Sequence, residues 1–201
     1  MNDMDETTLA WIRQYFREVA AFTERVMVFI EGGYLNAGLR DQFGARDIDL
    51  TKFSLCLAEG RRLMRTYYYT ATIENPPDDY WRREQSKQQR FLAALAYQPN
   101  MEVRLGRLQF GDGGIPRQKR VDVLLALDLH RFALKGNYDT AILVAGDADF
   151  SDIVRMVKDE GRRVEIYTFP GTRARSLLEA TDKSLEITEG LLKICWMANR
   201  V

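Results

Sequence analysis

The sequence predicts a single α/β domain built on a mainly parallel sheet. Apolar runs at residues 26–30 and 140–145 are typical of strands that are buried on both faces of such a sheet. Strands that alternate with helices, as the patterns here predict, are joined by right-handed crossovers. The 201 residues suffice for one sizeable core, and no repeat or linker divides them.

The first half of the chain alternates helical and extended patterns. Apolar residues recur every three or four positions in the first helix, which precedes the first strand and is therefore expected to form an added layer. The second strand is rich in tyrosine and threonine, which favour extended structure. In order, we predict a helix at 6–24, a strand at 26–30, helices at 34–43 and 49–60, a strand at 63–71 and a helix at 80–97.

The second half begins with an alternating pattern that is typical of a strand with one face in water. A glycine-rich loop and a short basic run at 116–120 follow this strand, and glycines mark the ends of the next two helices. The predicted elements are a strand at 101–110, a helix at 121–135, a strand at 140–145, a helix at 150–160, a strand at 163–169 and helices at about 174–181 and 189–199.

The composition limits the kinds of function that the chain can have. With 29 basic and 29 acidic residues, no overall field attracts nucleic acid, so a polyanion needs a local basic patch. Cys56 and Cys195 lie among apolar residues and are interpreted as reduced, buried thiols of a cytoplasmic protein; with the single His130 they form no zinc pattern. The start is acidic and polar, so we expect no signal peptide, and no apolar run approaches a membrane span of about 18 residues.

Acidic side chains stand where predicted strands end or helices begin. Asp147 and Asp149 follow the strand at 140–145, Glu31 follows the first strand, and Asp122 opens a helix. Because parallel strands end at one edge of a sheet, these four acids are expected to converge there. Hard oxygen ligands in such a cluster suit magnesium or manganese, which can hold a phosphodiester and activate water.

Structural roles are the alternatives for these residues. Asp149 can instead cap the helix that starts near Phe150, and Asp122 can be an acid favoured by the helix dipole. Gly146 is expected to allow a sharp turn after the strand. Asp128 is a fifth candidate, but it lies about 240° around the helix from Asp122 and is interpreted as a solvated or salt-bridged acid.

Three motifs carry the acids: Phe29-Ile30-Glu31-Gly32-Gly33-Tyr34-Leu35, Lys119-Arg120-Val121-Asp122-Val123 and Gly146-Asp147-Ala148-Asp149-Phe150. In order and spacing they resemble the signatures of the NYN domain family, whose bacterial members are often called LabA-like, over roughly residues 25–188. The family is similar to PIN-domain nucleases. The resemblance therefore implies a Rossmann-like, three-layer α/β/α sandwich, here with an N-terminal helical extension at 1–24 and a C-terminal helix at 189–201.

The resemblance also implies an activity, namely metal-dependent cleavage of RNA that leaves 5′-phosphate and 3′-hydroxyl ends. Carried over, the catalytic and metal-binding positions are Glu31, Asp122, Asp147 and Asp149, with magnesium or manganese as the cofactor. Lys119 matches the lysine that usually precedes the valine–aspartate pair. Ser176 and Asp182 resemble a serine and an aspartate that occur late in the domain.

Two positions depart from the family pattern. Glu31 stands where the family usually has aspartate, and its extra methylene can displace a metal ligand. Tyr34 stands where many members have asparagine. A second hypothesis is therefore a catalytically weak or inactive NYN module that binds RNA or a protein partner. A third is a phosphatase-like or nucleotide-binding α/β enzyme.

The candidate RNA contacts are basic or hydroxyl side chains near the acids: Arg117, Lys119, Arg120, Arg173 and Ser176. Arg104 and Arg107 can extend this set into a phosphate track or belong to a solvated face. The tyrosines at 67–69 can stack bases, although strand alternation favours core packing for them. The terminal helices are candidates for contacts with a second copy or a protein partner.

Overall fold

The computed structural model describes residues 6–44, 47–110, 116–172 and 174–197. Its strands are β1 (Arg25–Glu31), β2 (Arg62–Ile73), β3 (Met101–Phe110), β4 (Pro116–Lys119), β5 (Thr140–Val144), β6 (Arg163–Thr168) and β7 (Lys183–Glu186). They form one seven-stranded sheet of order β4-β3-β2-β1-β5-β6-β7. Neighbouring strands are parallel except β3 and β4, so six strands form the parallel centre and β4 is an antiparallel edge.

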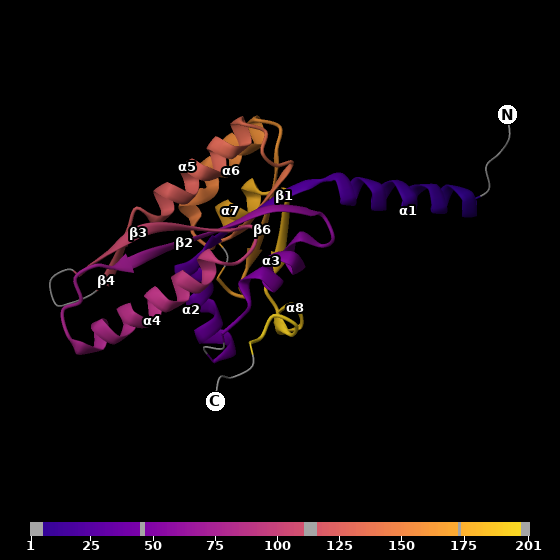
Figure 1. Cartoon of the computed structure of the whole chain (residues 1–201). Helices are drawn as coiled ribbons and strands as arrows, with labels where there is room; N and C mark the ends of the chain where they lie inside the picture. The colour runs from indigo at the N-terminus through magenta and orange to yellow at the C-terminus, as the bar shows by residue number, and fades with distance from the viewer. Residues whose placement is uncertain (1–5, 45–46, 111–115, 173, 198–201) are drawn as a thin grey trace.

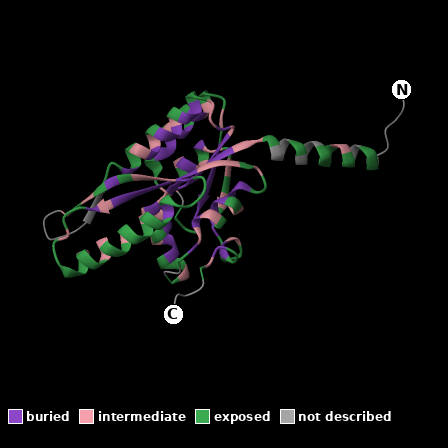
Figure 2. Cartoon of the chain, viewed as in Figure 1, coloured by how far each residue is buried: buried purple, intermediate pink, exposed green. Residues whose placement is uncertain are grey.

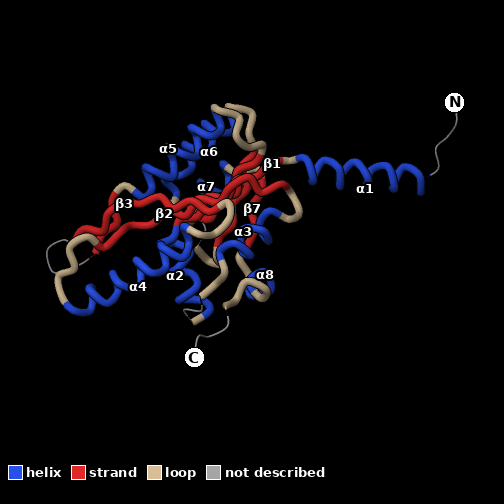
Figure 3. The backbone as a smooth tube through the Cα atoms, in the orientation of Figure 1, coloured by secondary structure: helices blue, strands red, loops and turns tan. Residues whose placement is uncertain are grey.

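Helices cover both faces of the sheet, as Figures 1 and 3 show. On one face lie α2 (Gly32–Phe43), α3 (Leu50–Ala58), α4 (Asp79–Ala96) and α8 (Glu189–Leu192); on the other lie α5 (Val121–Leu134), α6 (Ser151–Asp159) and α7 (Arg175–Ala180). A short 3-10 helix, η2 (Ala148–Phe150), precedes α6. The predicted three-layer α/β/α architecture is confirmed.

The core consists of two apolar layers, one on each side of the sheet. Along β1, Val28 and Ile30 belong to the layer under α2 and α3, whereas Phe29 belongs to the layer under α5. The same alternation places Leu143 of β5 under α5 and Val144 under α2 and α3. The central residues of these strands, 26–30 and 141–144, are all apolar because both faces are covered, and Figure 2 shows the resulting buried centre.

The N-terminal helix α1 (Glu6–Thr23) differs from the expectation of an added layer. It forms where the periodicity predicts it, but it extends away from the sheet instead of packing on it (Figure 1). Its Trp11 and Tyr15 are 64% and 50% exposed, and their rings stack on each other with centroids 5.5 Å apart.

The C-terminal helix is shorter than the predicted range of 189–199, because α8 ends at Leu192. The chain then runs beside residues 47–49: the Asp49 N–H donates to the Cys195 carbonyl at 2.8 Å, and the Met197 N–H donates to the Asp47 carbonyl at 3.0 Å. After a turn over residues 193–195, Trp196 forms an antiparallel bridge with Ile48, so the regular helix does not continue. The strands β4 and β7 are further additions to the predicted elements.

The two cysteines meet in this region. Both are free thiols, as interpreted from the sequence, and their Sγ atoms lie 3.7 Å apart. Burial, with the neighbouring Cys56, raises the pKa of Cys195 to about 12. Separately, none of the helices in the described ranges is both long enough and apolar enough to span a membrane.

Candidate active site

The topology forms a switch point between the carboxyl ends of β1 and β5. The strand order reverses at this pair, because β2 and β3 lie on one side of β1 while β6 and β7 lie beyond β5. The helices that follow the two strands, α2 and α6, consequently cover opposite faces of the sheet. Such a switch point is where open α/β sheets bind their ligands. Glu31 is the last residue of β1, and Asp147 follows shortly after β5.

Glu31 is a partly buried acid that faces other acids. Burial raises its pKa from 4.5 to about 7, and the negative charges of Asp122 and Asp147 add to this shift. The structure therefore brings residues from three separate motifs within electrostatic reach of one another. A proton therefore competes for the Glu31 carboxyl at a higher pH than it does for an ordinary glutamate.

Asp122 lies in the first turn of α5, as predicted, and its pKa is raised by burial and by the charges of Asp147 and Asp149. The residue that leads into this helix, Arg120, has a left-handed backbone with φ of 74°. That conformation is uncommon for a residue with a side chain and turns the chain from β4 into α5. The turn places Asp122 beside the acids that follow β5.

Asp147 holds the turn after β5. Its Oδ1 accepts a hydrogen bond from the Asp149 N–H at 3.0 Å, so the capping role belongs to Asp147 and not to Asp149. Gly146 is needed for space rather than for an unusual φ: a Cβ there would lie 2.4 Å from the Tyr34 ring. The expectation that Gly146 supplies a glycine-only turn is therefore wrong, and close packing explains this glycine.

Tyr34 connects α2 to the end of β6. Its hydroxyl accepts a hydrogen bond from the Phe169 N–H at 2.8 Å and lies 2.7 Å from the Thr172 hydroxyl. Its ring packs against that of Phe169 at 5.6 Å. The sequence shows only that a tyrosine replaces the usual asparagine; the structure shows that this tyrosine fixes the loop beside the acids.

The predicted RNA contacts are partly described. Lys119 and Arg120 are exposed directly before Asp122. Arg117 lies in β4, and its backbone pairs with that of Gln109 in β3. The side chain of Arg117 and the whole of Arg173 lie outside the described residues. The Ser176 hydroxyl accepts a hydrogen bond from Ser151 at 3.2 Å, and Ser151 also donates to the Ala148 carbonyl. Ser176 therefore lies near the turn that carries Asp147.

Asp128 and Arg104, which form an ion pair, have structural roles. Asp128 is buried and binds the Tyr69 hydroxyl at 3.2 Å, Arg104 at 3.1 Å and Arg131 at 2.7 Å. This confirms the salt-bridged interpretation of Asp128 and occupies Arg104, which also lies over the Tyr67 ring. The tyrosines at 67–69 are all buried, as core packing predicts.

Asp182 lies far from the acids in the fold. Its carboxylate accepts from the Val164 N–H at 2.8 Å and pairs with Lys158 at 3.1 Å. Val164 is near the start of β6, so Asp182 anchors the edge opposite to the candidate site. The weak motif match at Asp182 therefore corresponds to a structural residue.

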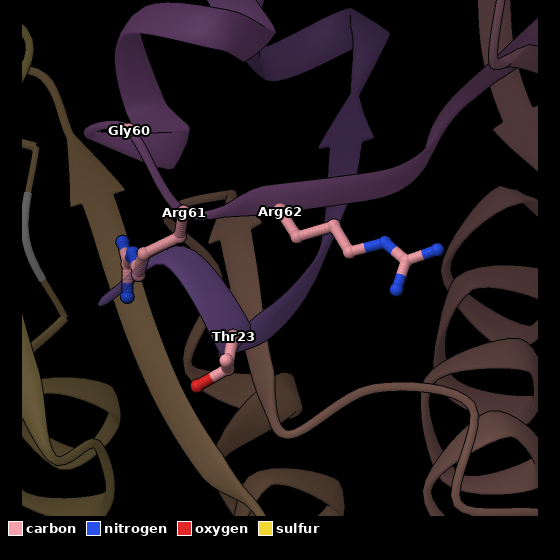
Figure 4. A pocket seen from close by; sticks show the side chains of 4 residues that line it. All are labelled: Thr23, Gly60, Arg61 and Arg62. Carbon is pink, nitrogen blue, oxygen red and sulfur yellow. The ribbon is translucent and has the colours of Figure 1, made fainter. Parts of the chain in front are cut away.

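The opposite edge of the sheet also carries a hollow of about 450 Å³ lined by Thr23, Gly60, Arg61 and Arg62 (Figure 4). Arg61 is nearly buried there and pairs with Glu165 at 2.8 Å and with Glu24 at 3.5 Å. Its charge is therefore already compensated. This hollow lies where β1 and β2 begin, away from the acids at their carboxyl ends.

The acids have the chemistry that binds a divalent cation, although they are not arranged as a complete set of metal ligands. Within the described ranges, no set of three or more His, Cys, Asp or Glu side chains is arranged to hold a metal ion. However, every charge that shifts the pKa values of Glu31 and Asp122 is negative. Carboxylate oxygens with uncompensated charge are the ligands that magnesium and manganese prefer.

Comparisons with known proteins agree with this fold. The NYN domain family model matches residues 25–188. A protein of unknown function from Vibrio parahaemolyticus, VPA0982, has a similar structure, with a TM-score of 0.61 and 21% identity over 84% of this chain and 95% of that one. A Parabacteroides merdae protein proposed to be an oxidoreductase gives a TM-score of only 0.32 at 12% identity, over 83% of this chain and 32% of that chain. No curated protein matches the sequence.

Proposed function

The chain belongs to the NYN domain family, and on that basis we propose that it is a metal-dependent ribonuclease that hydrolyses phosphodiester bonds at the carboxyl edge of its sheet. The observation that carries the proposal is the electrostatic coupling of Glu31, Asp122 and Asp147 at the switch point. Repulsion of the partly buried Glu31 by the exposed Asp122 and Asp147 costs stability, and a bound cation relieves it. Family membership supports the nuclease class, and the acids support the use of a metal.

Each acidic or basic residue at the switch point has a role in this proposal. Glu31, Asp122 and Asp147 would hold magnesium or manganese. The negative charge of Asp149 raises the pKa of Asp122, so Asp149 also acts on this site. When bound, the cation supplies positive charge to the phosphate oxygens and makes water a better nucleophile. Lys119 and Arg120, exposed beside Asp122, would attract the RNA backbone to this edge.

The remaining predicted contacts, Arg117, Arg173 and Ser176, are proposed to position the RNA backbone. Ser176 is the best placed of them, because it contacts Ser151 next to the Asp147 turn. A hydroxyl there can donate to a phosphate oxygen without adding charge. Attack of water on phosphorus opposite the bridging 3′ oxygen breaks the P–O3′ bond and leaves a 5′-phosphate and a 3′-hydroxyl, the products that the family resemblance implies.

Cleavage of a labelled single-stranded RNA with manganese tests the proposal. We expect Asp147→Asn to abolish cleavage, because the change removes a charged ligand. Asp152→Asn is the matched control: Asp152 lies nearby on α6, its side chain is 94% exposed, and it pairs with Arg155 on the same helix. The control should retain the parent rate. Cleavage that persists with a chelator, or at the parent rate in Asp147→Asn, would contradict the proposal.

A second candidate function is supported by two residues of the site. The pKa of Glu31 is raised to about 7, so a cation must compete with a proton there at neutral pH. Tyr34 uses its hydroxyl on Phe169 and Thr172. Both features fit a weakly active or inactive module that binds RNA or a protein partner. RNA binding without manganese-dependent cleavage would favour this candidate.

A further inference from the structure

One face of α4 carries a stripe of exposed residues with a repeated chemistry. Tyr80, Arg83, Lys87, Arg90 and Tyr97 lie three, four, three and seven positions apart, which places them within about 100° of arc on a helix. All five are exposed, and the tyrosines are 56% and 89% exposed. Figure 2 shows the outward side of α4 as exposed. We call these five residues the α4 stripe.

Most of the stripe is separate from the residues that attach α4 to the domain; only the Tyr80 ring touches one of them, meeting the Trp81 ring edge-on at 5.4 Å. Trp81 packs on Phe110 with ring centroids 5.0 Å apart, and Leu95 is buried in the core. Between them, the Gln85 amide donates to the Ile73 carbonyl at 2.6 Å and the Gln88 amide donates to the Ala71 carbonyl at 2.8 Å. Packing of the helix therefore does not explain the stripe.

The positive charge of the stripe is only partly compensated. Lys87 pairs with Glu84 at 2.7 Å, where its side chain remains 64% exposed. Arg83 and Arg90 form no ion pair with any residue that the structure describes. Together with Arg82, Ser86 and Asp79, the three cations line a surface hollow of about 470 Å³. In a chain of zero net charge, this is a local site for a polyanion.

We propose that the α4 stripe binds single-stranded RNA and guides it to the candidate active site, an inference that rests on the proposed function. The three cations follow one another along the helix axis at steps of about 6 and 4.5 Å, so they can contact successive phosphates. The tyrosines at the two ends can each stack an unpaired base. A duplex does not offer its base faces, and an acidic protein offers none, so the aromatic ends favour a single strand.

The first half of α4 packs beside the end of β2, which extends beyond the level of Glu31. Glu31, the last residue of β1, pairs in register with Tyr69, while β2 continues to Ile73. Gln85 and Gln88 bind this continuation of β2, so the first half of α4 lies beyond the level of Glu31. Figure 1 shows α4 running beside the extended ends of β2 and β3. RNA held on the N-terminal part of the stripe, near Tyr80 and Arg83, is therefore toward the edge of the sheet where the acids lie, whereas Tyr97, shortly before β3 begins, lies toward the opposite edge.

Fluorescence anisotropy with a fluorescein-labelled 20-nucleotide oligouridylate, in a chelator that prevents cleavage, tests the proposal. The variant Arg83→Gln/Lys87→Gln/Arg90→Gln should lower the slope of log affinity against log salt by about 2, because each phosphate contact contributes about 0.7. A slope lower by about 2 means that the ratio of the variant's affinity to the parent's affinity is about 100-fold smaller at 0.1 M salt than at 1 M salt. Tyr80→Ala and Tyr97→Ala should each lower the affinity at least about fivefold with the slope unchanged.

The matched control is Lys52→Gln/Lys135→Gln/Lys193→Gln, which removes the same charge from exposed lysines on other elements. It should retain most of the parent affinity and slope. Three results would overturn the assignment. The first is an equal loss of affinity in the control, and the second is no RNA binding by the parent protein. The third is equal binding of a duplex together with no effect of the tyrosine changes. Binding through the stripe without manganese-dependent cleavage contradicts only the ribonuclease proposal; cleavage of long RNA that is unchanged in the stripe variant contradicts only the stripe.

Discussion

Replacing Glu31 by glutamine should stabilise the protein in the presence of a chelator. The pKa of Glu31 rises from 4.5 to about 7 on folding, so the fold favours the protonated form. Its contribution to stability is present below pH 4.5 and is lost as the pH rises to about 7. A shift of this size is worth about 3 kcal/mol above pH 7, at 1.36 kcal/mol for each pKa unit. Glutamine is neutral at every pH and avoids this cost.

Urea unfolding at two pH values measures the effect. At pH 8 the variant should be more stable than the parent by up to about 3 kcal/mol, and at pH 5 by less than about 1 kcal/mol. Glu160→Gln, at an exposed position after α6, is the control and should show a pH-independent difference. If the Glu31→Gln difference is the same at pH 5 and pH 8, Glu31 is not a partly buried acid facing Asp122 and Asp147.

Three further predictions concern the core, the tyrosine and the cation. Leu143→Ala should reduce the free energy of unfolding by about 2–5 kcal/mol, since Leu143 is fully buried between β1 and β6; a loss below about 1 kcal/mol in chemical denaturation would contradict this. Tyr34→Phe should cost about 1–3 kcal/mol in thermal and urea unfolding, because the Phe169 N–H loses its acceptor, and unchanged stability would mean that water replaces the hydroxyl. Manganese affinity, measured by calorimetry, should fall by up to about tenfold per pH unit below pH 7, because Glu31 must lose a proton to bind; an affinity that does not change between pH 5.5 and 7 would exclude Glu31 as a ligand.

Much of the fold could be predicted because the central strands are buried on both faces. Val26 to Ile30 and the run at 140–144 contain almost no polar residue, and this pattern fits only a covered sheet. The strands β4 and β7 could not be found in this way. Their sequences, Pro-Arg-Gln-Lys and Lys-Ser-Leu-Glu, are short and polar because they lie at the two edges of the sheet. Pairing with β3 and β6, rather than their own composition, makes them strands.

The end of the C-terminal helix illustrates the same limit. The sequence predicts a helix over residues 189–199, but α8 ends at Leu192, a turn follows, and Trp196 then forms a bridge with Ile48. The partners lie about 150 positions away in sequence, and local patterns carry no information about them. For the same reason the 3.7 Å approach of Cys56 and Cys195 could not be predicted.

The candidate site was more accessible to prediction than its surroundings. The convergence of Glu31, Asp122 and Asp147 follows from parallel strands that end at one edge, which sequence order already indicates. The burial of Glu31 depends on packing around the switch point and could not be predicted. The bonds from Tyr34 to Phe169 and Thr172 join residues about 135 positions apart, and the motif shows only that a tyrosine is present. The metal itself stays a proposal.

A crystal structure of the protein soaked in manganese, with anomalous scattering used to locate the ion, tests the central claim most directly. The account predicts an anomalous peak coordinated by carboxylate oxygens of Glu31, Asp122 and Asp147 at the carboxyl ends of β1 and β5. The same soak of Asp147→Asn should weaken or remove the peak. Manganese bound only elsewhere on the protein, with these three carboxylates still apart, would contradict the account.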